Sequence, residues 1–386
     1  MRAVVTGMIA TYPLGGVVWD YLQYALGLQR LGWEVFYLED TGAATYDPTA
    51  GEYGEDCSYA VRFLARSLAA LSPDLAERWH FRSSAGQTFG VNFEEIGDVI
   101  ATADLLLNVS GSCLLRDEYL ACPCKVLIDT DPGYNHFVNY PRQDAGQLWP
   151  GTHSFREHDH FFTYAERIGV SDCRLPDFGL PWQPTRPLVV LDCWQPQPPA
   201  RTWTTVMTWD NFRRPIEHDG QTYGTKEREF GRIETLPRLA AVPLQVAVGG
   251  SDPPREKWRS LGWSVLDSHE ASRTAEDYRS YIQQSRGEFS VAKNVYVATR
   301  SGWFSCRSVC YLAAGRPVVV QDTGFSEIIP TGEGVFAFTD LETAAAAIAA
   351  VEADYRHQQT AAREAARRHF SHEVVLRQLL ERIGLG

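Results

Sequence analysis

The chain has 386 residues, of which 44% are hydrophobic. This is enough for more than one buried core and excludes a disordered protein. No apolar run approaches the roughly 20 residues of a membrane span, so stable insertion into a bilayer is not expected. The net charge of −12 is uneven, because residues 1–181 hold 12 Lys/Arg and 24 Asp/Glu, whereas residues 182–386 hold 24 of each. The acidic first half is expected to be repelled by nucleic acid and anionic lipid, and an anionic ligand is expected in the second half.

The cysteines and the start of the chain indicate a cytoplasmic protein with reduced thiols. Cys122 and Cys124 do not have the spacing of a zinc-binding pair, and no second pair follows. The chain enters a strand pattern directly, without a signal-peptide layout. His158 and His160 share one face of an extended segment, but no third ligand is in view, so no metal site is predicted.

In chain order, a strand at Arg2–Thr6, a helix over about 17–31 and a strand at 34–38 predict a βαβ unit. The loop before the helix lacks G-x-G-x-x-G, so it carries no dinucleotide fingerprint. Its Gly15 and Gly16 would let a ligand approach the backbone closely, although a plain flexible turn explains the pair equally well.

Next, a helical pattern covers residues 52–79, and buried parallel strands are predicted at 103–110, 125–129 and 160–164. Ligands of doubly wound sheets collect at the carboxyl ends of strands, which draws attention to the two carboxylates after the second of these strands. Asp131 precedes a proline, so it is equally compatible with a turn.

Six prolines in residues 178–200 mark a connection between two α/β halves. The elements expected beyond it are strands at 204–209, 244–250 and 263–266, a helix starting near 278, and helices over 341–368 and 372–383.

The most informative stretch, residues 301–324, predicts a loop, a short helix, a tight stop and a buried strand. Ser305 is the expected N-cap, and residues 318–320 form the strand. Free backbone N–H groups at the helix start, with Arg307 and Ser308 beside them, are typical of sites that bind a diphosphate. An ordinary capped helix in an α/β core accounts for the same pattern equally well.

Residues 312–319, 323–329 and 332–338 resemble the donor domain of GT-B glycosyltransferases. They are most similar to the large group 1, or family 4-like, enzymes, which include many retaining bacterial members. The first half resembles their acceptor domain, with a strand, a Gly-Gly loop, a helix and the sequence of residues 31–35.

The resemblance implies an α/β protein with two Rossmann-like domains that face a cleft. The implied segments are an acceptor-binding domain over 1–187, a donor-binding domain over 188–365 and a helix over 366–386 that crosses back to the first domain.

The implied activity is a hexosyltransferase-type reaction that moves a sugar from a UDP- or dTDP-sugar to a soluble small-molecule or glycan acceptor. No metal or other cofactor and no nucleic-acid partner are implied. The expected donor contacts are Trp209, Arg214, Lys226, Glu288, Ser301, Gly302, Trp303, Arg307, Ser308 and Asp322. The expected acceptor contacts are Gly15, Gly16, Asp129 and Tyr134.

An inverting reaction also needs a base within reach of the acceptor hydroxyl, for which Asp20, Asp131 and His136 are the candidates. A retaining reaction needs no such base, and these residues would then only orient the acceptor.

The chain departs from this family at its paired glutamates, which fall on Gly302 and Cys310. In the family they contact the donor sugar and the ribose, so donor identity and stereochemistry stay open here. Glu288, Asp322 or Glu327 are expected to take over part of that role. A nucleotide-sugar epimerase or hydrolase on the same fold, or a non-catalytic nucleotide-sugar sensor, remain alternatives because a fold does not define its chemistry.

Overall fold

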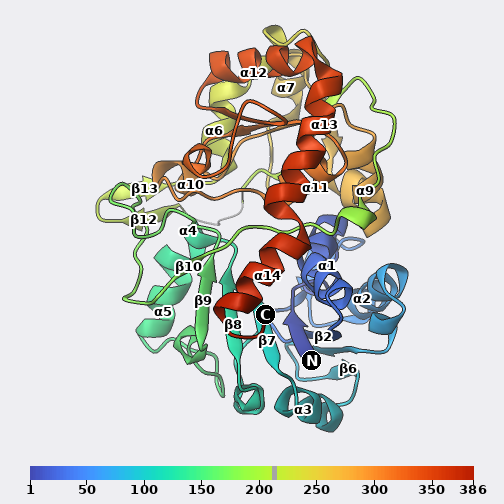
Figure 1. Ribbon diagram of the computed structural model, residues 1–386, viewed down its shortest axis with the longest axis vertical. Helices are drawn as coiled ribbons and strands as arrows, with labels where there is room; N and C mark the ends of the chain where they lie inside the picture. The colour runs from blue at the N-terminus through green and yellow to red at the C-terminus, as the bar shows by residue number, and fades with distance from the viewer. Residues whose placement is uncertain (211–214) are drawn as a thin grey trace.

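The computed structural model describes residues 1–210 and 215–386, and it shows two α/β lobes, one above the other in Figure 1. The amino-terminal lobe holds an eight-stranded sheet and the carboxy-terminal lobe a six-stranded sheet. The two-lobed α/β fold predicted from the sequence is therefore present.

The sheet of the amino-terminal lobe has the order β10-β9-β8-β7-β1-β2-β5-β6 and is parallel except for its last pair. Its strands are β1 (Arg2–Thr6), β2 (Glu34–Glu39), β5 (Trp79–Arg82), β6 (Thr88–Gly90), β7 (Leu105–Val109), β8 (Lys125–Asp129), β9 (His160–Thr163) and β10 (Gln183–Pro184). Strands β1, β7 and β8 are almost wholly buried and rich in Val, Leu and Ile, as a parallel sheet covered on both faces requires.

This lobe also contains a hairpin and five α-helices. They are β3 (Thr45–Asp47), β4 (Glu52–Gly54), α1 (Gly15–Arg30), α2 (Ser58–Leu71), α3 (Phe93–Ala101), α4 (Pro132–Tyr134) and α5 (Tyr140–Asp144). The single helix expected over 52–79 is wrong, because the segment holds β4, α2, a 3-10 turn and the start of β5. Gly54 ends the hairpin, and Pro73 follows the end of α2.

The sheet of the carboxy-terminal lobe is parallel throughout, in the order β15-β14-β11-β16-β17-β18. Its strands are β11 (Trp203–Thr208), β14 (Leu244–Gly249), β15 (Ser264–Asp267), β16 (Glu288–Ser290), β17 (Val318–Gln321) and β18 (Val335–Phe338), and a separate hairpin joins β12 (Ile216–His218) to β13 (Gln221–Tyr223). The helices of this half are α6 (Lys226–Ile233), α7 (Arg255–Ser260), α8 (Ser268–Ser272), α9 (Ala275–Gln283), α10 (Asn294–Ala298), α11 (Cys306–Ala313), α12 (Leu341–Ala353), α13 (Tyr355–Ala365) and α14 (His372–Arg382).

The helix expected over 341–368 is two helices, because the chain turns at Asp354. The Asp354 backbone is non-helical, and its carboxylate accepts a hydrogen bond from the N–H of His357, so it ends α12 and caps α13.

The carboxy-terminal helix α14 leaves the upper lobe and lies on α1 of the lower lobe (Figure 1). Gly27 makes this contact close, since a Cβ there would lie 2.8 Å from Leu376 and 2.9 Å from His372. The backbone of Val189 pairs with Phe370 and His372 on either side of the start of α14. The last helix therefore links the two lobes. Within residues 1–210 and 215–386, no helix is both long and apolar enough to cross a bilayer.

Candidate active site

The two lobes enclose a cleft with a volume of about 550 Å³. The lower lobe lines it with the start of α1 and the loops that follow β1, β7 and β8, and the upper lobe with the end of β11 and the starts of α6 and α11. These are the carboxyl ends of parallel strands, where α/β sheets bind ligands.

Helix α11 begins at the cleft, as predicted from residues 301–324. The hydroxyl of Ser305 caps it by accepting from the N–H of Arg307 at 3.2 Å, and Ser305, Cys306 and Arg307 all line the cleft. The open N–H groups and the positive end of the helix dipole favour an anion at this position.

Arg307 is neutralised by the neighbouring acid Glu288. The guanidinium Nε lies 2.5 Å from Oε1 of Glu288, and the other nitrogens donate to the carbonyl of Val206 and the hydroxyl of Ser290. Arg307 still lines the cleft, whereas Glu288 is fully buried beneath it. The expectation that Glu288 contacts the ribose is therefore wrong, because its carboxylate holds Arg307 instead.

Lys226, the first residue of α6, lines the cleft and has no acidic side chain paired with it. Its ammonium has neither a hydrogen bond nor an ion pair with any residue that the structure describes. Burial, and then the charges of Arg307 and Lys293, lower the pKa of Lys226 well below its usual value. An anion in the cleft would relieve both effects, because it would replace lost hydration and offset the neighbouring positive charges.

Asp20 projects from α1 into the cleft, which Cys306 at the start of α11 also lines. Burial raises the pKa of Asp20 to about 6, although Cys306, Arg307 and Lys226 each act to lower it. Among the three predicted bases, Asp20 is the carboxylate that faces the cleft without a strong cationic partner. A pKa close to the working pH suits a group that accepts a proton.

Asp131 lines the cleft but is committed to a bridge between the lobes. Its carboxylate pairs with Lys293 and accepts a hydrogen bond from the Tyr296 hydroxyl at 2.5 Å. These partners outweigh burial and lower the pKa of Asp131. Asp131 is therefore a bridging residue in this arrangement, and the hypothesis that it acts as a base is not supported.

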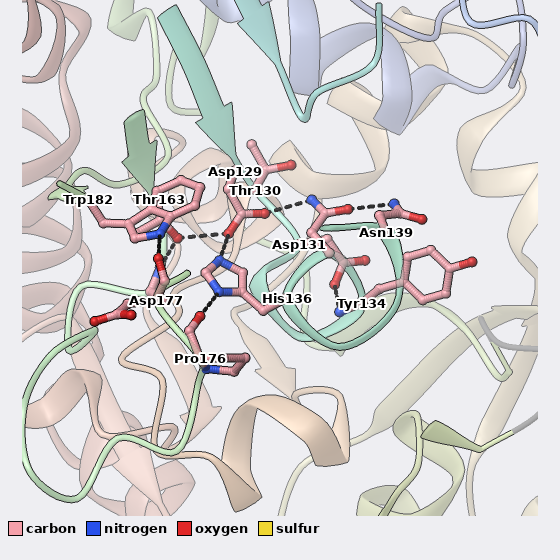
Figure 2. Close-up of polar contacts among 12 residues, drawn as sticks. Asp129, Thr130, Asp131, Tyr134, His136, Asn139, Thr163, Pro176, Asp177 and Trp182 are labelled. Carbon is pink, nitrogen blue, oxygen red and sulfur yellow. Dashed lines mark hydrogen bonds and ion pairs between the residues drawn. The ribbon is translucent and has the colours of Figure 1, made fainter. Parts of the chain in front are cut away.

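His136 is buried away from the cleft, in the network that Figure 2 shows. Its Nδ1 lies 2.6 Å from the carbonyl oxygen of Pro176 and its Nε2 lies 3.0 Å from Oδ2 of Asp129. Asp129 is itself fully buried and also accepts from Thr163 and Asn135. The predictions of His136 as a base and of Asp129 as a direct acceptor contact are therefore wrong, because neither side chain reaches the cleft.

Several predicted donor contacts also lie away from the cleft. Ser301 and Ser308 are fully buried, Trp209 packs on Trp258 and Phe230, and Asp322 caps the following turn by accepting from Gly324 and Ser326. Gly302 and Glu327 belong to the contact between the lobes: a Cβ on Gly302 would lie 2.8 Å from Cγ of Arg167, and Glu327 pairs with Arg167. Local sequence indicated the correct loops but not the direction of these side chains.

Trp303 and Tyr134 do line the cleft. Trp303 stacks on Tyr296 with ring centroids 4.4 Å apart, and its indole N–H donates to the carbonyl of Thr130 at 3.0 Å. Trp303 thereby crosses from one lobe to the other. Phe304, by contrast, is a core residue.

Gly15 and Gly16 allow the opposite lobe, rather than a ligand, to lie close to the backbone. A Cβ on Gly15 would lie 2.0 Å from the carbonyl oxygen of Thr274, and the N–H of Gly16 donates to the Ser272 hydroxyl at 2.9 Å. Gly16 lines the cleft, but Gly15 is covered by this contact. The remaining prediction, Arg214, lies outside the described residues.

Sequence reasoning missed Lys293, Cys306 and the amides of Asn135 and Asn139, which all line the cleft. Lys293 follows the three-residue strand β16, which is too short to give a periodic signal. Asn135 and Asn139 lie in a π-helical turn, which the helical period of 3.6 residues does not describe.

The described residues thus form two parallel-sheet lobes around a cleft that contains a helix N-terminus and the unpaired Lys226, an arrangement suited to binding an anion. Residues 229–382 match the family described as glycosyl transferase-like. No curated protein matches the chain.

Solved structures match over the whole chain. An alpha-glucosyltransferase in complex with UDP and a 13-mer DNA is 11% identical, with 100% of each chain covered and a TM-score of 0.61. Anabaena HepE in complex with UDP and glucose is 13% identical, with 99% of this chain and 98% of that chain covered and a TM-score of 0.54. AviGT4, a glycosyltransferase involved in avilamycin A biosynthesis, is 14% identical, with 99% and 96% covered and a TM-score of 0.52. The chain therefore has the GT-B fold of these structures.

Proposed function

We propose that the protein transfers a hexose from a UDP-sugar to a hydroxyl group of an acceptor. The acceptor lobe comprises residues 1–187 and the donor lobe residues 188–365. The observation that carries the proposal is Lys226, a cation held in the cleft beside the start of α11 with no acid on it within the described residues. We propose UDP as the nucleotide because two of the similar structures were solved with UDP.

The chemistry requires stabilisation of the leaving group. The bond between the anomeric carbon and the diphosphate breaks, and two negative charges develop on the departing UDP. A fixed ammonium and the open N–H groups of α11 stabilise that charge without reorganising. Arg307 supports the same position, although Glu288 cancels its net charge.

Asp20 is the group that we infer to contact the attacking hydroxyl. In an inverting reaction it takes the proton of that hydroxyl as the new C–O bond forms, and in a retaining reaction it orients the hydroxyl by accepting a hydrogen bond. Both roles need the ionised carboxylate, so activity is expected to fall below the pKa of about 6.

We infer a soluble small-molecule or glycan acceptor rather than DNA, although one similar structure was solved with DNA. The net charge of −12 lies in the half of the chain that forms the acceptor lobe. An acidic surface of this kind repels a polyanion and lacks the cations that phosphate contacts need.

The test is UDP binding by titration calorimetry to the wild type, Lys226→Ala and the control Lys257→Ala, whose lysine is exposed and paired with Glu234. Loss of a charge-assisted contact worth about 1.5–3 kcal/mol should weaken UDP roughly 10- to 150-fold in Lys226→Ala only. Uridine has no diphosphate, so its affinity should not change. Equal UDP affinity in all three proteins would contradict the proposal that Lys226 binds the diphosphate of the donor.

Turnover then tests the reaction class. A transferase consumes UDP-sugar only when an acceptor is present, whereas release or isomerisation of the sugar without an acceptor would contradict the proposal.

A further inference from the structure

Arg167 of the amino-terminal lobe packs into the carboxy-terminal lobe, outside the cleft. It follows β9, its side chain is only 4% exposed, and its backbone N–H donates to the carbonyl of Ser301 at 3.1 Å. A Cβ on Gly302 would lie 2.8 Å from Cγ of Arg167, and a Cβ on Gly324 would lie 2.8 Å from its Cδ. The two glycines therefore form a slot for this side chain.

Only glycine leaves this slot open. Gly302 and Gly324 have φ angles of 78° and 93°, in the left-handed region that other residues rarely adopt. For Gly324, the three atoms nearest to an added Cβ all belong to the side chain of Arg167. The stem of Arg167 thus occupies the space that the two glycines leave free.

A closed set of ion pairs holds the guanidinium in the slot. Arg167 pairs with Asp172 of its own lobe and with Glu327 of the opposite lobe. Arg300 of the opposite lobe pairs with the same two acids. Two cations and two carboxylates alternate, and such a network holds its members more firmly than an isolated surface pair does. Because Arg167 is also buried, it cannot swing aside as a free surface side chain could.

The slot lies at the start of the loop that leads into α11. The N–H of Gly302 donates to the carbonyl of Thr323 at 2.9 Å, and the Thr323 hydroxyl donates to the carbonyl of Trp303 at 2.6 Å, so the two glycine-bearing loops are joined. Trp303 and Ser305 line the cleft, and Ser305 caps α11. Arg167 therefore contacts the loop whose conformation determines where the open N–H groups of α11 point.

We propose that Arg167 is a positioning residue of the donor site. It belongs to the acceptor lobe and does not touch the donor, but it holds the loop before α11 in the conformation that binds the diphosphate. This inference rests on the proposed function. It makes donor affinity depend on a contact between the lobes that lies outside the cleft.

The first test is UDP binding to the full chain by titration calorimetry. Arg167→Ala empties the slot, so the nucleotide must order the loop as it binds, and UDP affinity should fall about tenfold. Arg167→Lys keeps the stem and one positive charge, so it should restore most of the affinity. The control Arg116→Ala breaks an ion pair with the buried Asp40 inside the acceptor lobe, and should lower Tm without changing UDP affinity.

The second test uses the slot itself and leaves the four charged side chains in place. Gly324→Ala and the control Gly332→Ala impose similar left-handed strain, since φ of Gly332 is 99°, but no described atom lies within 4 Å of a Cβ on Gly332. Gly324→Ala should therefore lower Tm and UDP affinity more than Gly332→Ala does. Once Arg167→Ala has removed the obstructing atoms, adding Gly324→Ala should lower Tm only as much as Gly332→Ala does.

The third test reports the loop directly. The ¹⁹F resonance of 5-fluorotryptophan at Trp303, assigned with Trp303→Phe, should move in Arg167→Ala and in Gly324→Ala. It should stay in place in Arg116→Ala. A residue that only stabilises the fold would leave this resonance unchanged in the folded protein.

Failure of the inference and failure of the proposed function are distinguishable. If the wild type binds UDP and Arg167→Ala binds it equally well, or binds it less well with an unchanged Trp303 resonance, the positioning role is wrong while the donor site stands. If Gly324→Ala lowers Tm equally with and without Arg167, the side chain does not fill the slot. If the wild type itself does not bind UDP, the proposed function fails and the positioning role fails with it.

Discussion

Asp20→Asn tests the electrostatics of the cleft through the stability of the protein. Burial raises the pKa of Asp20 from 3.8 to about 6, so folding favours the protonated carboxyl. The unfolded chain ionises near 3.8 and the folded chain near 6. Ionised Asp20 therefore destabilises the fold, and this cost is absent below about pH 4, develops between pH 4 and 6, and is complete above pH 6.

The size of the effect follows from the two pKa values. A difference of roughly two pKa units, at 1.36 kcal/mol each, corresponds to about 3 kcal/mol at pH 8. An entropy of unfolding near 2.1 cal/mol/K per residue gives about 0.8 kcal/mol/K for a chain of this length, so the shift in Tm is about 4 °C. An asparagine side chain carries no charge at any pH, so Asp20→Asn should be the more stable protein at pH 8 and equal to the wild type near pH 4.

The assay is a thermal scan of the wild type, Asp20→Asn and the control Asp252→Asn at several pH values between 4 and 8. Asp252 is exposed at a position with positive φ, which Asn tolerates, so that control should show no pH-dependent difference. A Tm difference that is the same at pH 4.5 and pH 8 would refute the reasoning. Asp20→Asn should also reduce kcat roughly 10²-fold or more if Asp20 accepts the proton of the attacking hydroxyl, and it should bind UDP at least as tightly, since it removes a negative charge from the cleft.

Two further predictions concern the groups that shape the cleft. Glu288→Ala leaves the buried guanidinium of Arg307 without its carboxylate and should lower the free energy of unfolding by about 3–5 kcal/mol. The double variant Glu288→Ala, Arg307→Met removes both charges and should recover most of that loss. Equal Tm values for the single and the double variant would contradict the ion pair. Gly15→Ala places a Cβ 2.0 Å from the backbone carbonyl of Thr274, so it should separate the lobes and lower both Tm and UDP affinity. Gly16→Ala places its Cβ 3.2 Å from a tyrosine ring and should lower Tm less. The reverse order of Tm values in thermal scans would show that the lobes do not meet there.

Elements with strong local signals were predictable. The strands at residues 2–6, 34–39 and 318–321 are short runs of buried apolar residues, and the helix at 306–313 has its cap residue and its apolar face within one stretch of chain. Such patterns depend on neighbours a few residues apart, so periodicity reports them directly. The elements that were missed include the strands within 52–79, the three-residue strand β16 and the break at Asp354, where the signal is too short or comes from a single cap.

The candidate site was predictable only in part. Lys226 and Asp20 were expected in the cleft and line it. Lys226 was expected from the resemblance to the family's donor-binding lysine, and Asp20 from its place on the first helix. Nothing local, however, indicates that Glu288 pairs with Arg307 or that Asp131 pairs with Lys293, 162 residues away. The direction of a loop side chain depends on which partner the packing brings near it.

The sequence alone therefore determined the two α/β halves, the capped start of α11 and the acidic character of residues 1–181, because those properties belong to local pattern and composition. Only the tertiary structure shows which charged side chains remain available to a ligand. Arg307 is paired with Glu288, Asp129 and His136 are buried behind the cleft, and Lys226 and Asp20 line the cleft. The physical reason is that the charge a site offers to a ligand is what remains after buried groups have found partners, and those partners are chosen by contacts between distant parts of the chain.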